Sequence, residues 1–295
     1  MKRLALLLAL LLVLRAREAQ ACAACGCGDP TLVAAGTEQP FAGRLRVSSE
    51  WRYRTDVVGE PGVDRIEIEE LRGELSVAWA PLRELFLVAA FPLVHRSIVD
   101  ASLAETSTWG PGDAELRAKL FLYRDRDLAP RSLLAGLFGL KFPTAPFRRN
   151  ELGERLPLEA QSGTGSLDLL AGASYAAFSG DFSAYASAQV ALPLLTREDV
   201  NPGVALRSTL AAQYQLTPWL ALRPAVDVRA DRASEEEGTR DPNSGGVVLF
   251  AGGDLLTTPL LDLTVSVGAR APLVQELHGF HDEGPVWSAA VAYDL

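Results

Sequence analysis

The stretch DAELRAKLFL at residues 113–122 places small or apolar residues and charged residues at alternating positions. Ala114, Leu116, Ala118, Leu120 and Leu122 form one set, and Asp113, Glu115, Arg117 and Lys119 stand between them. Successive side chains of a β-strand point to opposite faces of a sheet. The segment therefore predicts a strand with one apolar and one charged face, whereas a helix would repeat about every 3.6 residues.

The same period of two recurs along the chain. Clean alternation is found at residues 45–54, 71–79, 204–216, 220–229 and 261–270. Further stretches at 85–94, 132–142, 167–177, 182–192, 247–256 and 286–295 fit between these, although several are apolar or small on both faces. Together with residues 113–122 the pattern predicts twelve strands. This even number returns the C-terminus to the side where the first strand begins.

The links between these strands alternate in length. Long polar links at 56–64, 97–111, 144–165, 195–202, 231–243 and 273–284 alternate with short ones near Pro81, residues 124–131, Gly180, Pro218 and Pro259. Outer-membrane β-barrels have short periplasmic turns and long outer loops. The turns Ala80-Pro81-Leu82, Thr217-Pro218-Trp219 and Thr258-Pro259-Leu260 are each predicted to join two strands. The motifs Phe91-Pro92-Leu93, Phe142-Pro143-Thr144, Leu192-Pro193-Leu194 and Ala271-Pro272-Leu273 are predicted to end outgoing strands.

Aromatic residues gather at both predicted strand ends. Trp79, Tyr123, Trp219 and Tyr293 fall toward the short turns, and Trp51, Tyr53, Trp109 and Trp287 fall toward the long links. Two aromatic girdles are typical of transmembrane barrels. The predicted fold is all-β, a 12-stranded antiparallel transmembrane outer-membrane β-barrel. A soluble lipocalin-like barrel, with about eight strands and an apolar interior, is the alternative. Leu295 departs from the aromatic residue that usually ends such barrels.

Composition excludes several classes of protein. The 295 residues hold 28 Lys and Arg against 37 Asp and Glu, with 48% apolar residues. This apolar content excludes a disordered chain, and the acidic balance argues against a nucleic-acid partner. Beyond residue 21 no apolar run reaches the ~18 residues that a transmembrane helix needs.

The N-terminus predicts export. Lys2 and Arg3 precede an apolar run over residues 4–14, and Ala19-Gln20-Ala21 supplies small residues at a cleavage site. We therefore expect a signal peptide at residues 1–21, a Cys-rich periplasmic or plug segment at 22–42 and the barrel at 43–295. Cys22, Cys25 and Cys27 are the three cysteines of the chain. A local disulfide, lipidation of Cys22 and a soft-metal site stay open as alternatives.

The polar face of each strand is predicted to line the lumen. The lumen candidates are Arg46, Glu50, Arg52, Arg72, Glu74, Asp113, Glu115, Arg117, Lys119, Arg207, Arg223, Asp227, Arg229, Asp262 and Arg270. Because both signs of charge are mixed, the sequence predicts weak ion selectivity. Twelve strands leave a lumen of intermediate width, narrow or partly plugged.

One motif carries a resemblance to a known family. Trp109-Gly110-Pro111-Gly112-Asp113, followed by Leu116 and Lys119, resembles the W-G-x-G-D-x-x-L-x-x-K pattern of outer-membrane β-barrel transporters associated with the meta-pathway of phenol degradation. The resemblance covers eleven residues and their flanking strands. It implies passive passage of small solutes, aromatic or hydrophobic ones among them.

Candidate catalytic residues are few. His95 and Ser97 look like the His-x-Ser pair of outer-membrane phospholipase, but Ser107, Thr108 and Trp109 stand where its orienting Asn is expected. His278 and His281 with Asp282 and Glu283 form a His-x-x-His-Asp-Glu cluster, for which solvated loop residues are the preferred interpretation over a metal site. The sequence therefore predicts no enzyme, no catalytic residues, no metal ion and no cofactor.

The expected function is that of an outer-membrane channel or facilitator for passive uptake or efflux of small solutes. A lipolytic enzyme using His95 and Ser97, and a closed structural or binding barrel, are the alternatives. The expected partners are outer-membrane lipid, lipopolysaccharide and a small-molecule solute. The acidic run Glu235-Glu236-Glu237 could attract cations or bridge divalent ions to neighbouring lipopolysaccharide. The sequence does not distinguish a monomer from an oligomer.

Overall fold

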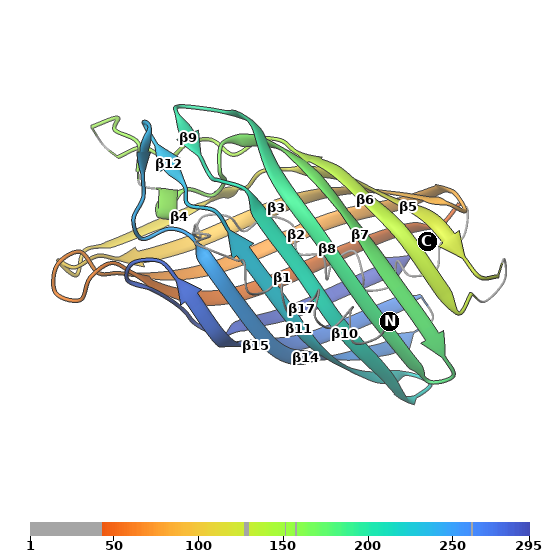
Figure 1. The fold of residues 1–295 in the computed structure, drawn as a ribbon. Coiled ribbons are helices and arrows are strands. Elements are labelled where there is room, and N and C mark those ends of the chain that lie inside the picture. The colour runs from red at the N-terminus through yellow and green to blue at the C-terminus, as the bar shows by residue number, and fades with distance from the viewer. Residues whose placement is uncertain (1–42, 127–129, 151, 157, 261) are drawn as a thin grey trace, which may run out of the picture.

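A computed structural model describes residues 43–126, 130–150, 152–156, 158–260 and 262–295. Twelve long antiparallel strands form the barrel wall (Figure 1). They are β1 (Leu45–Val58), β2 (Ile66–Leu82), β3 (Leu85–Val99), β5 (Glu115–Arg124), β6 (Ser132–Lys141), β7 (Ser166–Ser179), β8 (Phe182–Thr196), β10 (Ala205–Thr217), β11 (Leu220–Asp231), β14 (Gly246–Leu260), β15 (Leu263–Leu277) and β17 (Val286–Asp294). The strand number predicted from the alternation is confirmed.

Short elements complete the structure. These are β4 (Glu105–Pro111), β9 (Val200–Asn201), β12 (Glu235–Glu236), β13 (Thr239–Arg240), β16 (His281–Glu283) and the 3-10 helix η1 (Leu158–Ala160). The strands β9, β12 and β13 pair into a separate small sheet beside the long-loop end (Figure 1). In the described part of the chain, no helix is long and apolar enough to cross a membrane.

The first strand closes the barrel. On one side β1 pairs with β2, where Trp51 faces Gly73, and on the other it pairs with β17, where Trp51 faces Ala289. Each wall strand thus has a partner on both sides. Closure leaves no free sheet edge, which is the condition for a β-structure to span lipid.

The two faces of the wall differ in exposure and chemistry. On β1, Trp51 and Tyr53 are exposed, whereas Arg46 and Asp56 at alternate positions are buried. The eight predicted girdle aromatics are all exposed, and many leucines and valines join them. An apolar belt around a closed barrel matches a hydrocarbon environment. The closed wall with its apolar outer belt has the architecture of an outer-membrane β-barrel.

Several strands continue beyond their predicted ends. β4 pairs with β3 from Leu93 to Val99, so the predicted long link at 97–111 is largely a hairpin. Likewise β2 begins at Ile66 and β15 runs to Leu277. The outward side chains of these extensions include Glu67, Glu69 and Ser97, whereas Val58 and Ile68 are buried in an apolar cluster with Ile66 and Ile98 packed against it. The prediction was wrong there because the outward face, which is apolar in lipid, is polar in these extensions.

Three of the four proline motifs that were predicted to end outgoing strands mark irregularities inside strands. Pro193 and Pro272 pair at positions where the register shifts, and Pro92 lies where β4 gives way to β5. Only Pro143 follows a strand end, that of β6. Proline has no N–H for the ladder, so it is tolerated at bulges. The expectation that all four motifs end outgoing strands is therefore wrong for three of them.

Candidate functional site: the barrel lumen and the segment 142–165

The predicted lumen residues lie on the inner face of the wall, with one exception. The inward positions are Arg46, Glu50 and Arg52 on β1, Arg72 and Glu74 on β2, Asp113 before β5, Glu115, Arg117 and Lys119 on β5, Arg207 on β10, Arg223, Asp227 and Arg229 on β11, and Arg270 on β15. Asp262 is exposed in the turn between β14 and β15, with a positive φ of 66°. Its place in the lumen set is corrected, because the turn removes it from the strand alternation.

Ion pairs connect these inward charges along each wall. Arg117 lies 2.6 Å from Glu115 and 3.6 Å from Glu74. On the opposite wall Arg270 lies 2.8 Å from Asp227 and 2.9 Å from Asp254. Neighbouring opposite charges largely cancel the field that either sign would produce alone in the lumen.

Near the outer end, an ion pair spans the interior. Arg229 on β11 pairs with Glu283 on β16, and β16 extends the wall between β1 and β15, so that β15 and β14 lie between it and β11. On the β1–β3 side, Glu70 lies 3.0 Å from Arg54 and 2.5 Å from Arg96. Arg229 was a predicted lumen residue, whereas Arg54, Glu70 and Arg96 were not, because near the outer end the outward face is no longer consistently apolar.

His281 belongs to this outer cluster. It lies on β16, beyond the girdle residues Tyr53 and Trp287, and its side chain is fully buried. Burial, and then the positive charges of Arg229 and Arg54, lower the pKa of His281 to about 4. The prediction of a solvated loop histidine is wrong, because β16 turns its side chain into the protein.

Toward the short turns, the inner face carries an apolar cluster. Phe86, Phe121, Leu133 and Tyr185 are buried there, with Ala78, Ala80, Val88, Ala135, Ala176, Ala211 and Ala225 between them. The Lys119 ammonium lies 5.2 Å from the centre of the Phe121 ring. This cluster accounts for the stretches at 85–94, 132–142, 167–177 and 182–192 that read as apolar on both faces.

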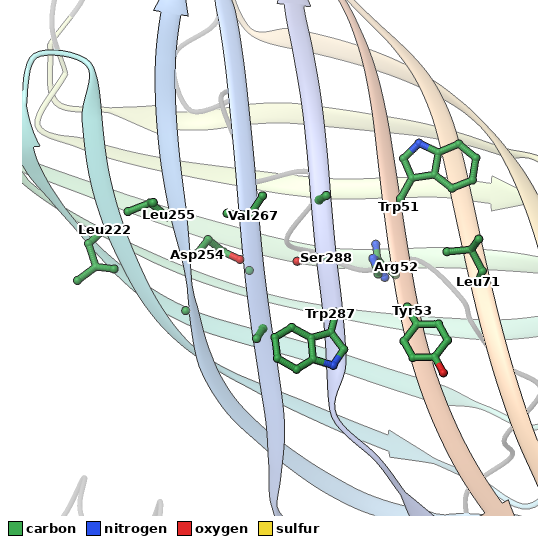
Figure 2. A pocket seen from close by; sticks show the side chains of 14 residues that line it. Trp51, Arg52, Tyr53, Leu71, Leu222, Asp254, Leu255, Val267, Trp287 and Ser288 are labelled. Carbon is green, nitrogen blue, oxygen red and sulfur yellow. The ribbon is translucent and has the colours of Figure 1, made fainter.

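Two cavities differ in place and size. A lumen cavity of about 50 Å³ is lined mainly by small or polar side chains such as Ser48, Ser76 and Ser266. A groove of about 650 Å³ lies on the barrel exterior, where Trp51, Tyr53 and Trp287 stand beside it (Figure 2). The groove lining consists mainly of apolar side chains of the outer belt, with Arg52, Asp254 and Ser288 of the inner face among them. The groove is therefore better suited to lipid chains than to a polar solute.

The described residues of the link between β6 and β7 (142–150, 152–156 and 158–165) fold against the inner face, and we call them the inward segment. Its side chains Gln161, Ser162 and Thr164 are buried. The Gln161 amide joins the two arms of the segment: it accepts from Arg148 N at 2.7 Å and donates to Leu156 O at 2.7 Å. The described part of this predicted outer loop therefore lies in the lumen.

The wall holds the inward segment through buried polar groups. Arg96 donates to the carbonyl oxygens of Glu159 at 3.0 Å and Gln161 at 2.5 Å. Asp113 accepts from the backbone N–H groups of Ala145 at 3.1 Å and Thr164 at 2.7 Å. Sequence reasoning placed Asp113 in the lumen but missed these partners, which lie 32 and 51 residues away in the chain.

The candidate catalytic pair lies on the outer face of β3. Ser97 Oγ donates to Glu105 Oε1 at 2.8 Å, and His95 Nε2 lies 3.1 Å from Ser107 Oγ. His95 also packs beside Trp109, with ring centroids 5.9 Å apart. The serine hydroxyl is thus directed to a carboxylate rather than to the imidazole that would activate it.

Comparison with known proteins returned structural matches. No family model matches the sequence, and no curated protein matches it. An outer-membrane channel from Pseudomonas putida F1 is 15% identical, with a TM-score of 0.70, over 88% of this chain and 98% of that one. The translocator domain of the autotransporter NalP from Neisseria meningitidis is 12% identical, with a TM-score of 0.52, over 89% and 92%. The NanC porin is 10% identical, with a TM-score of 0.50, over 85% and 100%. These matches establish the outer-membrane barrel fold.

Proposed function

We propose that the protein is a passive outer-membrane channel or facilitator for small solutes with an apolar, and in particular an aromatic, part. The observation that carries the proposal is that the inner face has one charged level and one apolar level. Ion-paired residues such as Arg117 and Arg270 line one level, and the cluster around Phe86 and Phe121 lines the level nearer the periplasm. An amphipathic solute would meet a surface of matching chemistry at each level.

The channel of Pseudomonas putida and the NanC porin share this fold, which supports the channel class. The phenol meta-pathway link rests on the motif at residues 109–113 and stays a prediction. Contact of the apolar belt with lipid and lipopolysaccharide is part of the proposal. Monomer and oligomer both stay open.

The predictions for the N-terminal residues are likewise part of the proposal. The signal peptide at 1–21, the Cys-rich segment at 22–42 and its three cysteines lie outside the described residues. We propose that residues 22–42 lie in or below the lumen and reduce passage. Removal of this segment is then expected to raise conductance.

Transport measurements on residues 22–295 test the function. The refolded barrel, verified by a heat-dependent gel shift, is placed in planar bilayers and in liposomes, and influx of an aromatic alcohol is compared with that of a sugar of similar size. We expect steady ion current and faster influx of the aromatic solute. Absence of both current and influx, with and without residues 22–42, would favour the closed binding barrel.

A matched pair of phenylalanines on β3 tests the apolar wall. Phe86 is buried in the inner cluster, and Phe91 is 54% exposed on the outer face. Phe86→Ala should reduce the preference for the aromatic solute, whereas Phe91→Ala should leave it intact. Equal effects of the two substitutions would contradict the role of the inner cluster.

The lipolytic alternative is not favoured by the partners of Ser97 and His95. An acylating phosphonate probe tests it directly on the refolded barrel. We expect no label on Ser97 or Ser107, and labelling that disappears in Ser97→Ala would restore this alternative.

A further inference from the structure

The motif at residues 109–113 contacts the inward segment at successive positions. Pro111 O accepts from Ser162 Oγ at 2.8 Å, and Gly112 O accepts from Thr144 Oγ1 at 3.0 Å. Trp109 O accepts from the Arg148 guanidinium. The proposed function does not use this motif, which therefore calls for its own explanation.

Asp113 joins the two ends of the inward segment. Its Oδ1 accepts from Ala145 N at 3.1 Å near the start of the segment. Its Oδ2 accepts from Thr164 N at 2.7 Å and from Thr164 Oγ1 at 3.1 Å near the end. One buried carboxylate thus closes the neck of the segment, with hydrogen bonds that are strong because the acceptor is charged.

The backbone around Asp113 and Gly163 allows the carboxylate and the inward segment to come into contact. The ladder partner of β3 changes from β4 to β5 at Pro92, and Gly112 N donates to Pro92 O at 2.9 Å. Gly163 lies against the carboxylate, since a Cβ there would stand 2.6 Å from Asp113 Oδ1. The interruption between β4 and β5 therefore lets Asp113 reach the segment, and Gly163 lets the segment come close.

The far part of the segment reaches the opposite outer loops. Arg155 donates to Glu198 O at 2.7 Å in the link after β8, and it pairs with Glu236 on β12 in the link after β11. Thr108 Oγ1 donates to Ala160 O at 3.1 Å on the β4 side. The segment consequently connects the β3–β5 wall with the loops after β8 and β11 at the outer end of the barrel.

We propose that Asp113 is a positioning residue that holds the inward segment across the outer part of the lumen, and that the segment so held sets the size limit of passage. This inference rests on the proposed channel function for its second half. The first half concerns the fold alone. The two halves can therefore be tested by separate readouts.

Cysteine accessibility tests the holding role without any transport. Ala160, 2% exposed, is replaced by Cys in a chain with Cys22, Cys25 and Cys27 changed to Ser, and its labelling by a water-soluble maleimide is timed. Addition of Asp113→Asn should raise the labelling rate at least about tenfold, because bonds to a charged acceptor are lost. Gly163→Ala, which crowds the same contact, should act in the same direction.

Asp254→Asn is the matched control. It also removes one buried inward carboxylate, but Asp254 pairs with Arg223 and Arg270 on the other wall. Labelling at position 160 should stay at the parent rate in this variant. A heat-dependent gel shift confirms that each variant is folded before labelling.

Single-channel conductance tests the second half of the proposal. Asp113→Asn and Gly163→Ala should raise the conductance and admit larger solutes, whereas Phe91→Ala, on the outer face, should change neither. Labelling at the parent rate in both folded variants, Asp113→Asn and Gly163→Ala, would overturn the holding role. Fast labelling with unchanged conductance would overturn the role of the segment in setting the size limit. No current in any variant, the parent included, would refute the channel function, and labelling would still decide the role of Asp113.

Discussion

Trp51 on β1 covers Gly73, its register partner on β2: a Cβ at position 73 would stand 2.8 Å from the indole ring. We expect Gly73→Val to lower the free energy of unfolding by about 1–3 kcal/mol, because the added side chain displaces the ring. Urea titration of the barrel in detergent measures this. The loss should shrink in a Trp51→Ala background, and an equal loss in both backgrounds would show that the ring is not the cause.

Glu70 is the centre of a buried ionic triad with Arg54 and Arg96. All three side chains are at most 12% exposed. Glu70→Gln should cost about 3–5 kcal/mol of unfolding free energy, because it takes the carboxylate away from the buried Arg96 guanidinium, while Arg54 keeps Asp56 at 3.0 Å. The same urea titration measures the cost. Arg65→Gln, in an exposed pair with Glu67, should change stability by less than about 1 kcal/mol and serves as the control.

His281 should make stability depend on pH. Its folded pKa is about 4 and its unfolded pKa about 6.5, so the unfolded chain binds more protons between these values. The contribution is therefore fully present above about pH 6.5 and is lost progressively as pH falls toward 4, by up to about 3 kcal/mol. Urea midpoints across this pH range measure the slope.

His281→Phe should flatten that slope over the same range. His95→Phe, on the outer face of β3, should retain it because His281 is still present. An unchanged slope in His281→Phe would assign the pH dependence to other groups.

The alternation predicted most of the wall because lipid imposes it. At 113–122, outward Leu116 and Leu120 face the belt and inward Arg117 and Lys119 face the lumen, so one short stretch reports both environments. The same rule failed at Glu67 and Glu105, which lie on strands above the belt. There water replaces lipid, so an outward polar side chain stays hydrated and has no desolvation cost.

The inward segment could not be predicted because its partners are distant in sequence. Residues 142–165 are rich in proline, glycine and charge, which is typical of an exposed loop. Its burial depends on Arg96 on β3 and on Asp113 between β4 and β5, which both lie far earlier in the chain. The stretches that are apolar on both faces did contain a signal for the inner apolar cluster, because inward residues such as Phe86 and Phe121 can line a lumen as well as a protein core.

The paired charges of the lumen predict weak ion selectivity in the wild-type channel. Asp227 and Asp254 both lie within 3.0 Å of Arg270, so the two carboxylates balance nearby guanidinium groups. The double substitution Asp227→Asn with Asp254→Asn leaves Arg223 and Arg270 without their acids. Reversal potentials in a salt gradient should then shift toward anion selectivity, and the shift should weaken at high salt as the charges are screened. A strongly selective wild-type pore would contradict the cancellation of charge in the lumen. An unchanged potential in the double variant would show that ions pass through a part of the lumen that these residues do not line.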